Sequence, residues 1–229
     1  MVRDCEIKLV HFSITTPALR VAYIEGAGDK IPECLNQLGY TVRRLDDESI
    51  TNGDLSQYDV IITGIRAYNT NERMPIYQPK LMEYVKNGGT LFVQYNTSNF
   101  LSTLKTEIGP YPFKITRDRV TDENAKITIL DSTDEIVNRP NKISITDFDG
   151  WIQERGIYFA GEYGSNYKTI FTMNDPGEKP SEGSVIVGPY GKGNFVYSGL
   201  VFFRELPAGV PGAYRLFVNL MSVGRNKTQ

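Results

Sequence analysis

The sequence predicts an α/β protein with a doubly wound, mostly parallel sheet and an antiparallel excursion in the second half of the chain. Residues 60–62 and 90–93 are short apolar runs rich in β-branched side chains, which is typical of strands buried on both faces. Between these runs, Tyr77, Leu81 and Tyr84 follow the spacing of one helix face. A strand, a helix and a second strand in this order require the two strands to lie parallel.

The elements before this unit follow the same alternation. Residues 21–24 predict a first buried strand. Residues 30–38 predict a helix that begins after Asp29, a favourable N-cap residue, and ends at Gly39. Residues 40–45 predict the second strand. Strands that alternate with helices are typical of the α/β class.

The pattern changes after Asn96. Short strand-like pieces, separated by Pro, Asp and Asn turns, lie at residues 113–116, 126–130, 142–145, 157–160 and 169–173. Residues 185–197 predict a hairpin around the glycine-rich sequence GPYGKG. Residues 210–223 carry apolar side chains at helical spacing and predict a closing helix that packs on the sheet.

We interpret residues 1–19 as a lead-in segment from an upstream domain and residues 20–229 as a single α/β domain, with Pro17 separating the two. The 25 basic and 27 acidic side chains give a net charge of -2, so no electrostatic footprint indicates nucleic acid or an anionic membrane. No apolar run approaches the roughly 20 residues that cross a bilayer. We therefore expect neither nucleic acid nor a membrane as a partner.

Polar side chains follow the predicted strands at the edge where the carboxyl ends of the strands meet. Open α/β sheets bind ligands at this edge. The candidate ligand-binding residues are Gly26, Gly28, Arg66, Tyr68, Asn69, Gln94, Tyr95, Asn96, Trp151 and Arg204. The set offers hydrogen-bond donors and no evident base. The alternative is that the arginine and amide side chains only satisfy loop carbonyl groups.

The only tryptophan, Trp151, lies beside Gln153, Glu154 and Arg155. A tryptophan near amide, carboxylate and guanidinium groups can line a sugar pocket by stacking and hydrogen bonding. The alternative is a core tryptophan beside a surface turn.

Several other chemistries lack the residues they require. Ile31 stands where a dinucleotide-binding fingerprint has its third glycine. His11 is the single histidine, and one histidine cannot build a multi-histidine metal site. Cys34 falls on the apolar face of the predicted helix, which favours a core residue over a nucleophile. We therefore expect no metal site and no cofactor.

Six segments of the chain carry a resemblance to a known family, and the match spans nearly everything from Arg20 onward. They read AYIEGAGDKIPECLNQLGY, YDVIITGIRAYN, YQPKLMEYVKNGGTLFVQYN, GPYPFKITRDRVTDENA, DFDGWIQERGIYFAGEY and GKGNFVYSGLVFFRELPAGVPGAYRLFVNLMS. The chain resembles the C-terminal domain found after LmbE/PIG-L-type N-acetylglucosaminyl deacetylase domains in Bacteroidetes-like bacteria. That domain is class I glutamine amidotransferase-like, and the resemblance implies a flavodoxin-like fold of the ThuA-like branch. It also implies an upstream deacetylase domain as partner and a periplasmic or extracytoplasmic location.

The chain departs from the amidotransferases at their catalytic positions. Members of that class place a cysteine nucleophile after the strand equivalent to residues 90–93, and a paired His and Glu later. Here Gln94, Tyr95 and Asn96 occupy that turn, and no histidine follows it. Glutamine hydrolysis by that triad is therefore excluded, because amide and phenol groups do not replace an activated thiolate. The zinc deacetylase motif is also absent from the sequence.

We therefore expect a non-catalytic accessory module that binds a polar ligand, a carbohydrate, at the carboxyl edge of the sheet or docks on the deacetylase domain. The alternative is a carboxylate-dependent hydrolase or sugar-modifying enzyme that uses Asp149 and Glu154 near Trp151. A purely structural interaction domain would instead expose an apolar patch near residues 7–18.

Overall fold

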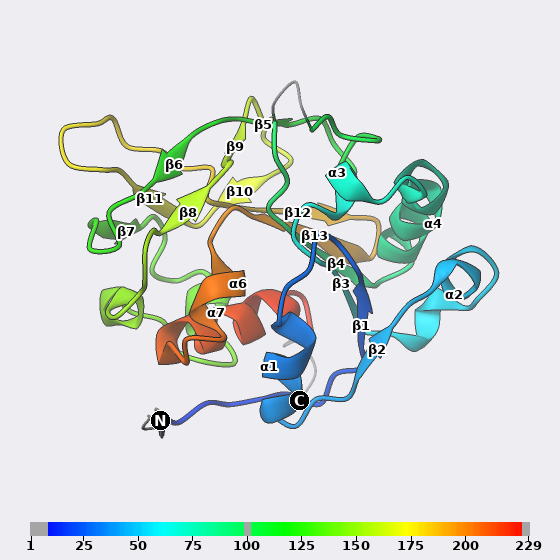
Figure 1. The fold of residues 1–229 in the computed structure, drawn as a ribbon, viewed down its shortest axis with the longest axis horizontal. Helices are drawn as coiled ribbons and strands as arrows, with labels where there is room; N and C mark the ends of the chain where they lie inside the picture. Colours follow the sequence, from blue (N-terminus) through cyan, green and yellow to red (C-terminus); the bar gives the residue numbers. More distant parts are fainter. Residues whose placement is uncertain (1–8, 99–101, 226–229) are drawn as a thin grey trace, which may run out of the picture.

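A seven-stranded sheet forms the centre of the computed structural model, which describes residues 9–98 and 102–225 (Figure 1). In order across the sheet, the strands are β10 (Lys168–Thr169), β12 (Val185–Tyr190), β13 (Gly193–Ser198), β4 (Thr90–Gln94), β3 (Val60–Thr63), β1 (Val21–Ile24) and β2 (Val42–Arg44). The five strands from β13 to β2 run parallel, whereas β12 and β10 are antiparallel to their neighbours. The predicted α/β class with a mostly parallel sheet is confirmed.

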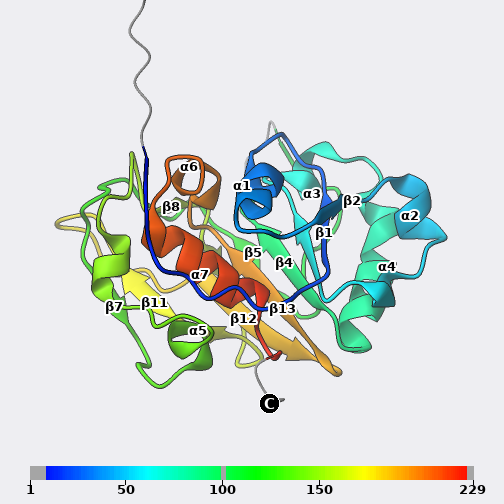
Figure 2. The same cartoon turned by 90° about the horizontal axis from the view of Figure 1, so that it is seen from below.

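Helices cover both faces of this sheet, as Figure 2 shows. They are α1 (Ile31–Gln37), α2 (Asp47–Thr51), α3 (Ala67–Thr70), α4 (Met74–Lys86), α5 (Glu135–Asn138), α6 (Phe202–Glu205) and α7 (Pro211–Met221), with 3-10 turns η1 (Leu55–Gln57) and η2 (Ile145–Phe148). Helices α1 and α7 lie on one face, and α2 and α4 lie on the other (Figure 2).

Two hydrophobic cores result from the alternation of side chains along each strand. Tyr23 and Phe92 point to the face of α1 and α7, whereas Ala22 and Leu91 point to the face of α4. Every residue of β1, β3 and β4 is buried, as the apolar runs predicted.

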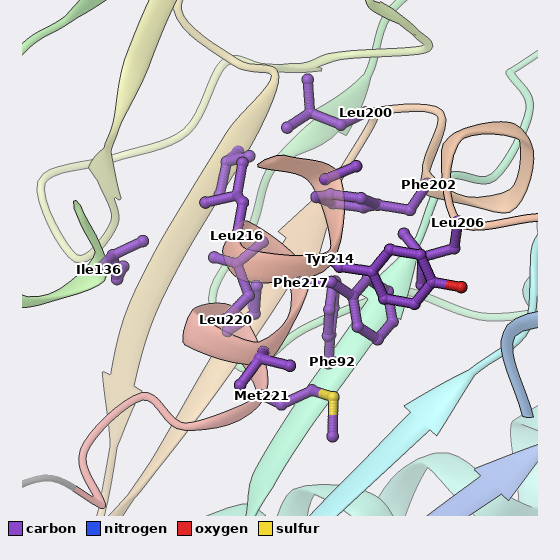
Figure 3. Packing of buried hydrophobic residues seen from close by; sticks show 14 of the residues in the cluster. Phe92, Ile136, Leu200, Phe202, Leu206, Tyr214, Leu216, Phe217, Leu220 and Met221 are labelled. Atoms are coloured by element: carbon purple, nitrogen blue, oxygen red, sulfur yellow. The ribbon is translucent and has the colours of Figure 1, made fainter. Parts of the chain in front are cut away.

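The closing helix α7 packs its apolar side chains against the sheet (Figure 3). The Phe217 ring lies 4.8 Å from the Phe92 ring and 5.1 Å from the Phe202 ring, between centroids. Leu216, Leu220 and Met221 belong to the same cluster of buried side chains. The helix predicted over 210–223 is confirmed with the bounds Pro211–Met221.

The excursion between β4 and β12 forms three small antiparallel sheets of two strands each. They pair β7 (Ile127–Ile129) with β11 (Phe171–Met173), β5 (Lys114–Ile115) with β9 (Ala160–Gly161), and β6 (Arg119–Val120) with β8 (Gly156–Ile157). The strand expected over 142–145 was wrong. Ser144 N donates to the carboxylate of Asp147 at 2.8 Å, and this capping interaction begins the turn η2 instead.

Residues 9–19 lie along α7 without forming a helix or a strand (Figure 2). Thr15 and Asn141 exchange two hydrogen bonds, from Thr15 N at 2.7 Å and from Asn141 Nδ2 at 3.0 Å. The Phe12 ring lies 5.6 Å from the Tyr214 ring of α7. Leu9 is 93% exposed, so the described segment begins in solvent before it reaches the helix.

Candidate functional site

The carboxyl ends of β1, β3, β4 and β13 meet at one edge, because these strands are parallel neighbours. The loops after β1 and β3 touch there through their backbones, since Ala27 N donates to Ile65 O at 2.8 Å. A Cβ atom on Gly26 would lie 2.2 Å from that same oxygen, so only glycine permits this approach. Gly28 has a φ of 101° and open space around it, so its role is to make the turn. Both glycines therefore shape the edge.

Gln94 and Asp29 tie three loops together beneath this edge. The carboxylate of Asp29 accepts from Ile31 N at 3.0 Å, from Ile65 N at 3.1 Å and from Gln94 Nε2 at 3.3 Å. Gln94 Nε2 also donates to Thr63 O at 3.2 Å, and the residue is 2% exposed. The amide of Gln94 is therefore turned to the protein and away from solvent.

Tyr68, Asn69 and Asn96 join the loop after β3 to the loop after β4. Tyr68 is fully buried, and its hydroxyl donates to Gln78 Oε1 at 2.7 Å. Asn96 Oδ1 accepts from Tyr68 N at 2.9 Å. Asn69 makes paired bonds with the backbone of Thr97, at 2.8 Å and 3.1 Å. The hydrogen bonds of these three residues therefore hold α3 to α4 and to the loop after β4, and serve the protein itself.

Arg66 differs from these residues because its side chain makes no hydrogen bond to the described residues. Its φ is 57°, in the left-handed region that non-glycine residues rarely adopt, and its N–H donates to Tyr95 O at 2.8 Å. The guanidinium of this half-buried residue has no partner among residues 9–98 and 102–225, and its Nε is a buried atom without a hydrogen bond. A buried polar atom without a partner calls for an explanation.

An aromatic group lies next to Arg66. The ring of Tyr95 is parallel to that of Tyr158, at 6.1 Å and 8°, and is tilted against that of Phe203 at 5.3 Å. Tyr158 has a φ of 55°, and its carbonyl accepts from the Tyr197 hydroxyl at 2.6 Å, which fixes its unusual backbone. Tyr158 and Phe203 are only half-buried, so parts of both rings face solvent.

Arg204 and Glu154 complete the surface around Tyr95. Arg204 Nε donates to Glu154 Oε1 at 3.1 Å, and its guanidinium carbon lies 4.8 Å from the centre of the Phe203 ring. Burial raises the pKa of Tyr95, and the charges of Arg66 and Arg204 act against that rise. We call this surface the edge patch, and its members are Arg66, Tyr95, Glu154, Tyr158, Phe203 and Arg204.

Glu205, next to the edge patch, is a carboxyl group that sequence reasoning missed. It is fully buried, and its carboxylate accepts from Ile152 N at 3.1 and 3.2 Å. Burial raises its pKa to about 7, although the Ile152 N–H and the nearby Arg155 and Arg204 favour the charged form. Nothing in the sequence FFREL distinguishes this glutamate from an exposed helical residue.

Trp151 lies in the core and not at the edge patch. It is 3% exposed, its Nε1 donates to Asp147 O at 3.1 Å, and its ring lies 5.3 Å from that of Phe148. Asp149 is exposed in the turn after η2, whereas Glu154 is paired with Arg204. The two carboxylates named for a hydrolase therefore stand in different surroundings.

The members of the edge patch do not line the main cavities of the structure. None of the five most pronounced cavities among the described residues includes a member of the patch. The described part of the chain also holds no group of three or more His, Cys, Asp or Glu side chains placed to bind a metal. None of its helices combines the length and the apolar character needed to cross a bilayer.

No family model and no curated protein sequence matches the chain. Solved structures do match it. The cytoplasmic protein STM3548 from Salmonella typhimurium has a TM-score of 0.54 and 16% identity, over 89% of this chain and 98% of that chain. The cytoplasmic protein STM1381 from Salmonella typhimurium LT2 has a TM-score of 0.53 and 12% identity, over 88% of this chain and 98% of that chain.

A cold-adapted β-galactosidase from Rahnella sp. R3 is similar over part of its length. The TM-score is 0.54 and the identity 14%, over 91% of this chain but only 31% of the β-galactosidase chain. At identities this low, all three likenesses show the α/β fold alone.

Proposed function

We propose that this chain is a flavodoxin-like α/β module that binds a carbohydrate at the carboxyl edge of its sheet and has no catalytic function by itself. The order of the parallel strands, β2-β1-β3-β4-β13, supports the flavodoxin-like class, because flavodoxin-like sheets place their five strands in the order 2-1-3-4-5. We also propose that the module is an accessory of an LmbE/PIG-L-type deacetylase, and the resemblance of the sequence to the domain that follows such deacetylase domains supports this.

The edge patch is the observation that carries this proposal. A sugar ring has an apolar C–H face, which stacks on half-exposed aromatic rings such as those of Tyr158 and Phe203. Its hydroxyl groups hydrogen bond to charged side chains at the rim, and charge-assisted hydrogen bonds are the stronger ones. Arg204 lies over the Phe203 ring and is paired with Glu154, and the charges of Arg66, Glu154 and Arg204 all act on Tyr95.

The surroundings of Gln94 and Glu154 argue against catalysis at this edge. Gln94 lies where the amidotransferases have their nucleophile, and its amide is hydrogen bonded to Thr63 O and Asp29. Glu154 is paired with Arg204, whose Nε donates to Glu154 Oε1 at 3.1 Å, so this carboxylate already has a partner.

Thermal unfolding against amino sugars, N-acetylated sugars and oligosaccharides tests the proposal. A ligand that binds only the folded state adds about 2.7 kcal/mol at a hundredfold excess over its dissociation constant. We expect Phe203→Ala and Tyr158→Ala to abolish the stabilisation by the sugar. Tyr190→Ala is the matched control, because Tyr190 is also a half-buried aromatic residue but packs on Tyr111 away from the patch. If no sugar stabilises the unmodified chain, carbohydrate binding is refuted.

Docking on the deacetylase domain is a second candidate, and the start of the described chain favours it. Leu9 and Val10 are 93% and 38% exposed, and they line a cavity of about 430 Å³ together with Phe12, Leu206 and Tyr214. This is the position where an interaction domain was expected to expose apolar side chains. We expect Leu9→Glu to weaken association with a purified LmbE-type deacetylase domain in analytical ultracentrifugation, and unchanged association would exclude this surface.

A further inference from the structure

Arg66 differs from the other described arginines because it is half-buried and its side chain has neither an ion pair nor a hydrogen bond among the described residues. Arg20, Arg44 and Arg73 form ion pairs with carboxylates, as several others do. Arg43 and Arg139 form no ion pair with the described residues, but both are exposed to water. Arg66 alone among the described residues has a buried cationic nitrogen without a hydrogen-bond partner.

Leaving the Nε of Arg66 unpaired is costly, because this buried atom loses its hydrogen bond to water without replacing it. The protein nevertheless fixes Arg66 in a left-handed backbone conformation through its bond to Tyr95 O. Residues in such conformations persist only where their surroundings hold them, and they concentrate at ligand sites. The side chain of Arg66 is thus held in place for a partner that residues 9–98 and 102–225 do not supply.

The charges of the edge patch define what that partner must carry. Arg66 and Arg204 contribute two positive charges, Glu154 contributes one negative charge, and the patch is left with one net positive charge. The neighbouring Glu205 is fully buried and turned to Ile152 N, so it does not occupy the guanidinium of Arg66. A single negative charge on the ligand would balance the patch.

We infer that the natural ligand is an acidic sugar whose carboxylate binds Arg66 while its ring stacks on the aromatic residues of the patch. This inference rests on the proposed function. A guanidinium matches a carboxylate through two parallel N–H···O bonds, which gives both strength and orientation. A phosphate would bring up to two negative charges next to Glu154, which disfavours a phosphorylated sugar.

Isothermal titration of the full chain with glucuronate, glucose and glucose 6-phosphate tests the inference. We expect glucuronate to bind at least tenfold more tightly than glucose, which corresponds to about 1.4 kcal/mol. Arg66→Gln should remove that preference, and Arg66→Lys, which keeps the charge but loses the planar fork, should retain only part of it. Arg43→Gln is the matched control, because it removes an exposed arginine outside the patch and should leave the preference intact.

The outcomes separate the inference from the function on which it rests. If glucose and glucuronate bind equally, or if glucose 6-phosphate binds best, the carboxylate inference is overturned and carbohydrate binding stands. If the preference for glucuronate survives in Arg66→Gln with unchanged thermal stability, Arg66 is not the receptor and the inference is overturned. If neither these nor the other sugars bind, the proposed function fails as well.

Discussion

Replacing Glu205 by glutamine should make the protein more stable at neutral and higher pH. The folded protein holds this carboxyl away from water and raises its pKa from 4.5 to about 7. Between these values the folded state binds more protons than the unfolded state. The stability of the protein therefore falls as the pH rises through this window, and it levels off above about pH 7.

The size of the effect follows from the same two values. The difference between 4.5 and about 7, at about 1.36 kcal/mol per pKa unit, corresponds to roughly 3 kcal/mol. Glutamine has the same shape and keeps an oxygen that can accept from Ile152 N, but it cannot ionise. The variant should therefore lack this loss of stability.

Urea unfolding of both proteins at pH 5 and pH 8 measures the difference directly. We expect the free energy of unfolding of Glu205→Gln minus that of the unmodified protein to increase by about 2 to 3 kcal/mol from pH 5 to pH 8, which means that the variant becomes relatively more stable. Other titrating groups cancel, because they are common to both proteins. A difference that stays the same at both pH values would refute the argument that burial keeps Glu205 protonated.

Three further changes test other parts of the structure. Asp175→Asn should give a pH dependence opposite to that of Glu205→Gln. Burial raises the pKa of Asp175, but hydrogen bonds from residues 121 and 122 have the larger combined effect and lower the pKa below its ordinary 3.8. The stabilisation by the native carboxylate should thus disappear as the pH falls below this value, which urea unfolding at pH 2.5 and pH 6 would show. Phe217→Ala should cost about 3 to 5 kcal/mol of unfolding free energy, because the ring fills the core beneath α7; a cost under about 1 kcal/mol in urea unfolding would contradict that packing. Gly26→Ala should cost about 2 kcal/mol or more, since its Cβ would meet Ile65 O, and calorimetry would show the lower melting temperature.

Local patterns were sufficient to predict the parallel half of the fold. The runs at 60–62 and 90–93 and the helical spacing between them identify a buried parallel unit, because burial on both faces selects a nearly continuous apolar run in place of alternation. The excursion was harder, because two-residue strands such as β8 carry almost no periodicity. At residues 142–145, a side-chain cap decided the backbone where alternation had suggested a strand.

Part of the edge patch could be named from the sequence, because some of its residues directly follow predicted strands. Arg66, Tyr95 and Arg204 were named because they follow strands, and the structure brings them together. Tyr158 and Phe203 were missed, since they reach Tyr95 across more than sixty and one hundred residues of chain. Sequence alone cannot show whether an amide or phenol near a strand end faces solvent or a loop carbonyl. Tyr68, Asn69, Gln94 and Asn96 were named as ligand-binding residues for the same reason, but the structure shows that their side chains are hydrogen bonded within the protein.

The place of β13 within the sheet has a consequence for how the chain folds. This strand lies between β4 and β12, yet it comes from residues 193–198, far after β4 in the sequence. During synthesis, β4 therefore keeps an unpaired edge until residues 193–198 have left the ribosome. An open edge made of buried apolar residues can pair with other chains. A nascent or truncated chain that ends before Gly193 would thus be prone to aggregation, and arrival of the hairpin partner β13 converts that exposed edge into the centre of the sheet.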